Sequence, residues 1–70
     1  MDASTWTAEF AKALGVEAPS EEQVATLLSL ASVAAHASER AAAPIACWLA
    51  AKAERSSSDA LALARALVAE

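Results

Sequence analysis

The side chains with the most chemical potential lie in one short stretch, "AHASERAAAP", over residues 35–44. It supplies an imidazole at His36, a carboxylate at Glu39 and a guanidinium at Arg40, and it ends at Pro44. Residues three and four positions apart on a helix are neighbours, so these groups would be close enough to interact. The stretch is therefore either a binding site or the corner between two helices.

Catalysis by this stretch is disfavoured, because the groups that a catalytic site brings together are missing. The only thiol, Cys47, is expected in the middle of a helix on a face of small residues, where thiols are commonly buried and inert. The chain has one glycine and thus no glycine-rich phosphate loop, and no paired carboxylates are spaced for acid–base work. We predict no catalytic residue and no enzymatic activity.

A metal or small ligand is the next candidate for this stretch. His36, Glu39 and Cys47 offer three donor types, but their spacing matches no zinc signature. The prediction is therefore no metal and no other cofactor, with a small-ligand or metal carrier kept as an alternative.

Two interpretations of the corner stay open. In the structural one, Arg40 binds the free carbonyls at the end of the preceding helix, and His36 adds favourable charge there when protonated. In the functional one, His36, Glu39 and Arg40 form an exposed contact for a partner or an anion.

Helical spacing of apolar residues predicts four helices, over residues 5–14, 21–37, 41–54 and 58–69. Gly15 can adopt the left-handed conformation that ends the first helix. Ser20 and Gln23 match the capping-box pattern that opens the second. Pro44 is tolerated only in the first turn of the third helix, and its ring disfavours one continuous helix from 21 to 54.

The apolar stripes predict which side chains form the core. In the third helix Ile45, Trp48 and Leu49 form the main stripe, which places Trp48 in the core, whereas the other side carries the small residues Ala43, Ala46, Cys47 and Ala50. Trp6 completes a stripe of the first helix, and the alternative is that it stays exposed as an anchor for a partner. Ser57 or Ser58 is expected to cap the fourth helix.

Alanine dominates the composition, with 22 of the 70 residues, and hydrophobic residues make up 57% of the chain. Alanine favours helix and fills little core, while the larger residues are mostly Leu. We predict one all-α domain over residues 1–70, a small antiparallel four-helix bundle with close, alanine-rich packing. Because so light a core barely offsets the entropy of ordering the chain, association with a partner would stabilise it.

The charges exclude some partners. The net charge is −4, and the five basic residues form no run, which disfavours nucleic acid. The chain starts without the basic and apolar segments of a signal peptide, and charged residues interrupt its apolar runs, so we expect a cytoplasmic protein without membrane association. A single cysteine excludes an internal disulfide.

The sequence resembles a small uncharacterised bacterial domain family, over roughly residues 6–69. The resemblance rests on Trp6, on residues 13–15 (Ala-Leu-Gly), and above all on the motif His36-x-x-Glu39-Arg40-x-Ala42-Ala43-Pro44. The motif departs from the family pattern at Ala41, where proline is common. Members of the family occur alone or appended to molybdenum-cofactor guanylyltransferases.

This resemblance implies a setting and not an activity. We expect a non-catalytic accessory or adaptor domain that binds a protein partner, such as a molybdenum-cofactor guanylyltransferase, in the synthesis of molybdopterin guanine dinucleotide. A homodimeric structural protein, joined through the small-residue face of the third helix, is a further alternative.

Overall fold

The computed structural model describes residues 1–69, which form four α-helices. They are α1 (Ala3–Leu14), α2 (Glu21–Ala37), α3 (Ala42–Lys52) and α4 (Ser57–Ala69). This part of the chain contains no strand, and α2 packs against both α3 and α4. The prediction of a small all-α protein with packed helices is confirmed.

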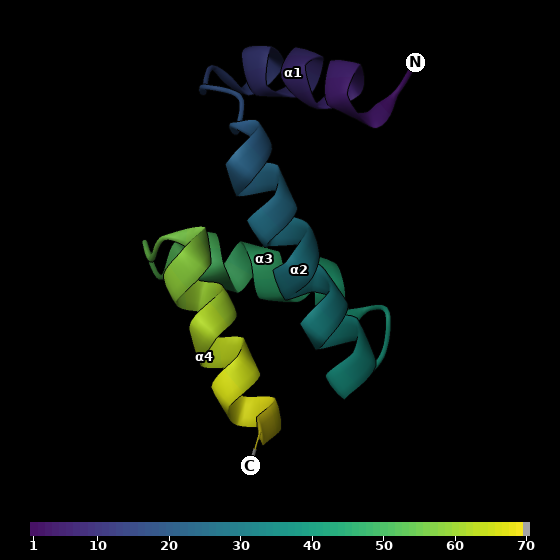
Figure 1. The fold of residues 1–70 in the computed structure, drawn as a ribbon. Coiled ribbons are helices and arrows are strands. Elements are labelled where there is room, and N and C mark those ends of the chain that lie inside the picture. Colours follow the sequence, from purple (N-terminus) through teal and green to yellow (C-terminus); the bar gives the residue numbers. More distant parts are fainter. Residues whose placement is uncertain (70) are drawn as a thin grey trace.

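The helices divide into a packed unit and an outlying helix (Figure 1). Helix α3 crosses α2, and α4 lies beside α2 and runs in the same direction. Within the described residues, no Cα atom of α1 lies within 8 Å of a Cα atom in another helix. The packing is therefore that of a three-helix body, α2 to α4, with α1 projecting from one end, an arrangement that the amphipathic pattern did not predict.

The connector between α1 and α2 is fixed by hydrogen bonds at both ends. Gly15 has φ +76°, and the N–H groups of Gly15 and Val16 donate to the carbonyls of Lys12 and Ala11 at 3.1 and 3.0 Å. This is the Schellman pattern, in which a left-handed residue satisfies the last carbonyls of a helix. A Cβ atom at Gly15 would meet nothing within 4 Å, so glycine serves the backbone conformation alone.

The capping box predicted for α2 is present in full. The hydroxyl of Ser20 accepts a hydrogen bond from the Gln23 N–H at 3.1 Å, and Gln23 Oε1 accepts from the Ser20 N–H at 2.8 Å. Glu21 and Glu22 occupy the first turn, where negative charge is favourable. Local hydrogen bonding thus sets the start of the longest helix independently of tertiary packing.

Four predicted helix ends differ from the structure. Helix α3 begins at Ala42, one residue later than predicted, and the other three differences have local reasons. Helix α1 begins at Ala3 and not at residue 5, because the carboxylate of Asp2 accepts a hydrogen bond from the Thr5 N–H at 2.7 Å. Helix α3 ends two residues early, where Glu54 takes a left-handed φ of 59°. Helix α4 begins at Ser57 because Ser56 caps it: Ser56 Oγ accepts a hydrogen bond from the Asp59 N–H at 3.1 Å. The predicted caps, Ser57 or Ser58, are therefore wrong.

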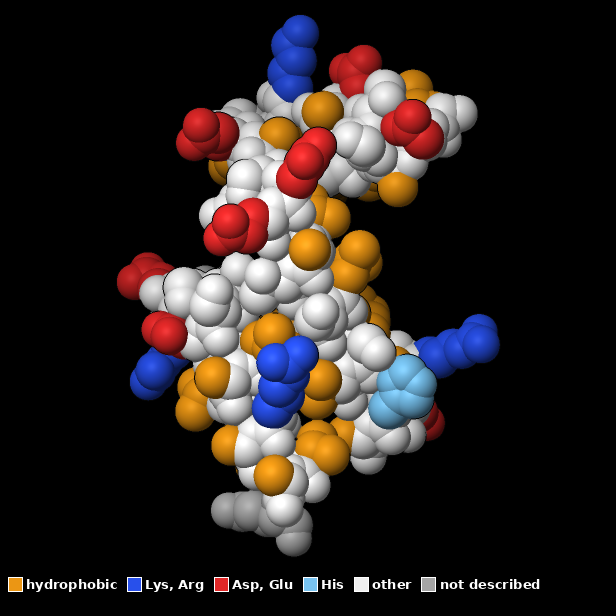
Figure 2. Space-filling view, in the orientation of Figure 1, with side chains coloured by type: hydrophobic (Ala, Val, Ile, Leu, Met, Phe, Trp, Pro, Cys, Tyr) orange, Lys and Arg blue, Asp and Glu red, His pale blue; other side chains and the backbone are white. Residues whose placement is uncertain are grey.

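The core of the described residues is small. Only Ala11 and Leu30 are buried, and Leu30, at 3% exposure, extends from α2 into the angle between α3 and α4. The radius of gyration is 12.6 Å, against about 11 Å for a compact domain of this length. Hydrophobic side chains accordingly appear over much of the surface in Figure 2. Stability of the body depends heavily on one leucine.

The orientation of α3 is opposite to the predicted one. Ile45, Trp48 and Leu49 are exposed, whereas the small residues of this helix, Ala43, Ala46, Cys47 and Ala50, are half-buried. Cys47 and Ala50 line a hollow together with Leu27 of α2, and Ala46 and Ala50 line another together with Leu30. Small side chains let two crossing helices approach closely, while a tryptophan between them would hold the axes apart. The predicted core position of Trp48 is therefore wrong, and the small face proposed for a dimer is used within the chain.

Two leucines on α2 provide a direct test of where the core lies. We expect Leu30→Ala to lower the free energy of unfolding by about 2–5 kcal/mol, since it leaves a cavity at the helix junction. Leu28→Ala, two residues away on a side chain 66% exposed, should change it by less than about 0.5 kcal/mol. Urea unfolding followed by circular dichroism measures both. Equal losses in the two variants would contradict the assignment of Leu30 as the core residue.

The cap of α1 predicts an acid-sensitive helix. The pKa of Asp2 is lowered from 3.8 because the Thr5 backbone N–H, and secondarily its side chain, hydrogen-bonds to the carboxylate. Because the pKa of Asp2 is lower in the folded chain than in the unfolded one, its carboxylate stabilises α1 fully above pH 3.8. This stabilisation is lost as the pH falls through the lowered pKa. Helicity by circular dichroism should therefore decrease over this range in the wild type.

The variant Asp2→Asn is the matched control, because asparagine caps equally well and does not titrate. The difference between the two acid titrations isolates Asp2 from the other carboxylates. Superimposable titrations of wild type and Asp2→Asn would show that this cap does not hold α1.

Candidate functional site

The corner between α2 and α3 is built by backbone hydrogen bonds. Helix α2 ends as the Ser38 N–H donates to the Ala34 carbonyl at 3.1 Å, and Ser38 then leaves the helical conformation with φ −135° and ψ −97°. The next turn is closed by the Ala42 N–H, which donates to the Glu39 carbonyl at 2.9 Å. The chain therefore reverses over residues 38–41, between the two helices.

Pro44 explains why α3 starts where it does. In a continuing helix the Arg40 carbonyl would accept a hydrogen bond from residue 44, but proline has no N–H. This carbonyl instead accepts from the Ala43 N–H at 3.1 Å. Pro44 lies in the first turn of α3 with its ring exposed.

His36 is held on the last turn of α2 by its own helix. Its Nδ1 lies 2.7 Å from the Ser32 carbonyl oxygen and 3.3 Å from the Ser32 hydroxyl. Because a carbonyl can only accept, Nδ1 carries the proton of this bond. The ring is exposed (pale blue in Figure 2), and its Nε2 is left to accept from, or when protonated donate to, a partner.

The three chemical groups of the motif share the corner but not a helix face. His36 belongs to α2, whereas Glu39 and Arg40 lie in the turn after it, so the helical spacing of three and four residues does not apply to them. Both charged side chains are exposed. The corner therefore presents His36, Glu39 and Arg40 to a partner's surface. It does not bring them together around an enclosed ligand site.

The corner continues directly into the exposed side of α3. We call the residues Pro44, Ile45, Trp48 and Lys52 the outer face of α3. Trp48 is 61% exposed, and the Lys52 ammonium lies 5.6 Å from the centroid of its ring, within cation–π range. An apolar strip with a cationic end therefore begins four residues after Arg40.

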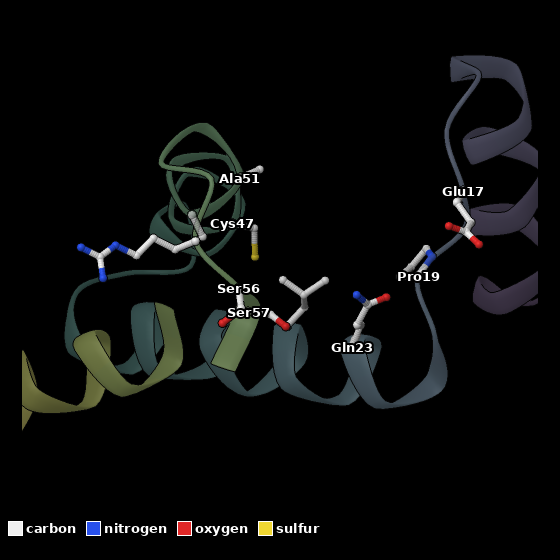
Figure 3. Close-up of a pocket in the computed structure, with 10 residues that line it drawn as sticks. Glu17, Pro19, Gln23, Cys47, Ala51, Ser56 and Ser57 are labelled. Atoms are coloured by element: carbon white, nitrogen blue, oxygen red, sulfur yellow. The ribbon is translucent and has the colours of Figure 1, made fainter. Parts of the chain in front are cut away.

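A cavity of about 310 Å³ lies between the α1–α2 connector, α2, α3 and the start of α4, and sequence reasoning missed it (Figure 3). Glu17, Gln23, Cys47 and Ser57 are among the residues that line it. Gln23 is already engaged in the capping box. No signal in the sequence marks this cavity, because the crossing of α2 and α3 creates it.

The structure does not bring Cys47 to the corner. Cys47 borders the cavity beside Leu27, and Leu27 lies nine residues before His36, about 13 Å along the axis of α2. Among residues 1–69 no group of three or more His, Cys, Asp or Glu side chains is placed to hold a metal ion.

Trp6 lies on α1, away from the corner. Its ring stacks on Phe10 with centroids 4.9 Å apart and planes at 25°, and both side chains remain about half exposed. The pair forms an apolar surface on a helix whose Cα atoms, among residues 1–69, stay more than 8 Å from those of the other helices.

A family model described as a domain of unknown function, DUF6457, matches residues 1–70. The chain belongs to this family. No match was found among curated proteins or among solved structures. In the part of the chain that the structure describes, no helix is long and apolar enough to cross a lipid bilayer. Because the function of this family is unknown, membership in it assigns no activity. The function is therefore argued from the exposed residues of the corner and of α3.

The outward orientation of Trp48 gives a prediction. Trp48→Ala should change the free energy of unfolding by less than about 0.5 kcal/mol, whereas a tryptophan in the core would cost about 3–5 kcal/mol. In a Trp6→Phe background, Trp48 is the only indole, and we expect the emission of a water-exposed ring with ready quenching by iodide. Blue-shifted, unquenched emission would place Trp48 inside.

Proposed function

We propose that this chain is a non-catalytic accessory domain that binds a protein partner through the corner and the outer face of α3. The observation that carries the proposal is the exposure of Ile45 and Trp48, at 58% and 61%, in a chain whose described part buries only two side chains. Large apolar groups left in water on one face are typical of interaction sites.

The composition of this surface fits a protein–protein contact. Tryptophan and arginine are the residues that most often dominate binding energy, and a polar rim around an apolar centre is the usual arrangement. Here Trp48 and Ile45 supply the centre, and His36 and Arg40 supply a rim that suits a carboxylate or phosphate on the partner.

The proposed partner is a molybdenum-cofactor guanylyltransferase, in the cytoplasm. This choice rests on the resemblance of the His36-to-Pro44 motif to domains appended to such enzymes. The motif residues His36, Glu39, Arg40 and Pro44 are all exposed, which is compatible with a role in binding. The domain would act by contact, for example by holding the enzyme near an acceptor of its product.

Copurification with a tagged guanylyltransferase tests this proposal. We expect Trp48→Ala to weaken binding at least about 10-fold, as loss of a central tryptophan commonly does, and Arg40→Ala and His36→Ala to weaken it less. Lys12→Ala on α1 and Val68→Ala on α4 are matched controls that remove a charge and an exposed apolar group elsewhere, and they should bind as the wild type does.

Two results would overturn the proposal. Absence of binding by the wild type would exclude this partner. Equal recovery with Trp48→Ala, Arg40→Ala and wild type would show that the corner and the outer face of α3 are not the contact.

A further inference from the structure

We propose that two copies of this chain form a symmetric dimer in which α1 of each copy packs into the groove between α3 and α4 of the other. This inference goes beyond the proposed function, because it concerns α1 and the far side of the body and not the corner or the outer face of α3.

Helix α1 presents an apolar stripe that its own chain leaves uncovered. Trp6, Phe10 and Leu14 follow helical spacing and are each about half exposed or more. An isolated helix of this length is marginal in water, so burial of the stripe would stabilise it. The stacked rings of Trp6 and Phe10 make its centre rigid.

An apolar groove of about 260 Å³ lies between α3 and α4, with the core residue Leu30 at its base. The large apolar side chains that border it and remain more than half exposed are Leu49, Leu63 and Leu67. A groove with an apolar lining is the type of surface that receives the apolar face of an amphipathic helix.

Charge distribution favours a second copy as the occupant. Residues 1–35 contain five acidic side chains and one basic, whereas residues 36–69 contain three acidic and four basic. In Figure 2 the acidic side chains gather over α1 and the start of α2. On α1 and its cap the carboxylates of Asp2 and Glu9 outnumber the one cation, Lys12, and Arg55 borders the groove, so docking would place a net-negative helix beside a positive charge.

The exposed area matches what a dimer would bury. The chain has 5545 Å² of accessible surface, while a compact monomer of its mass would have about 4,100 Å². The excess of about 1,400 Å² exceeds the roughly 800 Å² that each partner buries in a standard interface. When each copy places its α1 in the groove of the other, the two contacts are related by a two-fold axis. The apolar stripes of both α1 helices are then covered.

The groove of the same chain is not within easy reach of α1. Helix α1 and the end of α4 lie at opposite ends of a molecule 39 Å long (Figure 1). The Gly15 turn and the Ser20 capping box fix both ends of the connector and leave only residues 17–19 between them, about 10 Å of chain when extended. A second copy can present its groove to α1 without any change in this connector.

Sedimentation equilibrium of the full chain gives the first test. At about 50 μM, where even weak dimers are populated, we expect twice the 7.1 kDa chain mass. The α1 variant Trp6→Ala/Phe10→Ala and the groove variant Leu67→Asp should each raise the dissociation constant at least about 10-fold. All three altered side chains are exposed, so folding should persist, and circular dichroism checks it. A wild type that remains monomeric would overturn the proposal.

Mixing the two variants provides the decisive test. The intact α1 of the groove variant can dock on the intact groove of the α1 variant, so the mixture should form a heterodimer although each variant alone does not dimerise. A dimer joined through α1 on α1, or groove on groove, would lose dimerisation in only one variant and would not be rescued by mixing. Either result would refute reciprocal exchange.

The proposal of partner binding and the proposal of a dimer can be refuted independently. Trp48→Ala lies outside α1 and the groove and should leave the dimer intact, whereas Leu67→Asp should leave binding of the guanylyltransferase intact. A dimer that dissociates on Trp48→Ala would place the interface on the outer face of α3 and contradict the exchange.

Discussion

The close crossing of α3 over α2 is the constraint on which the rest of this structure depends. Ala46, Cys47 and Ala50 let the two helix axes come close, and larger side chains at these positions would separate them. The same rotation of α3 that turns these small residues inward turns Trp48 outward. An alanine-rich interior thus leaves the bulky residues on the surface, and the interaction face is a consequence of how the body packs.

The corner between α2 and α3 places polar side chains next to the apolar outer face of α3. Helix α2 ends at Ala37, and because Pro44 cannot donate to the Arg40 carbonyl, α3 begins after the turn with its outer face adjacent to Arg40. His36 is held by Ser32 on the last turn before the break, which leaves one ring nitrogen available. The predicted bond from the Arg40 side chain to the last carbonyls of α2 is not present among the described residues. Backbone hydrogen bonds make the turn instead, and they leave the Glu39 and Arg40 side chains exposed.

The features that local chemistry determines were predictable from the sequence, and the features that depend on distant contacts were not. The glycine turn, the Ser20 capping box and the break before Pro44 each involve residues within a few positions of one another. By contrast, both sides of α3 are apolar, so hydrophobic pattern alone could not choose between the large and the small side. The size of the residues at the crossing with α2 determines which side of α3 faces inward. Likewise, three consecutive serines at 56–58 offer equivalent caps. The amphipathic pattern of α1 also could not show that this helix stands apart from the other three.

A body with one buried leucine and two exposed apolar surfaces links folding to association. Any partner that binds only the folded state adds its binding free energy to a stability that is small at this chain length. A second copy that covers α1 and the groove would stabilise α3 and α4 against each other, because Leu49 and Leu63 come from the two helices that share the groove. The outer face of α3 lies outside both α1 and the groove, so a dimer of this kind would leave that face open to a partner and its affinity unchanged.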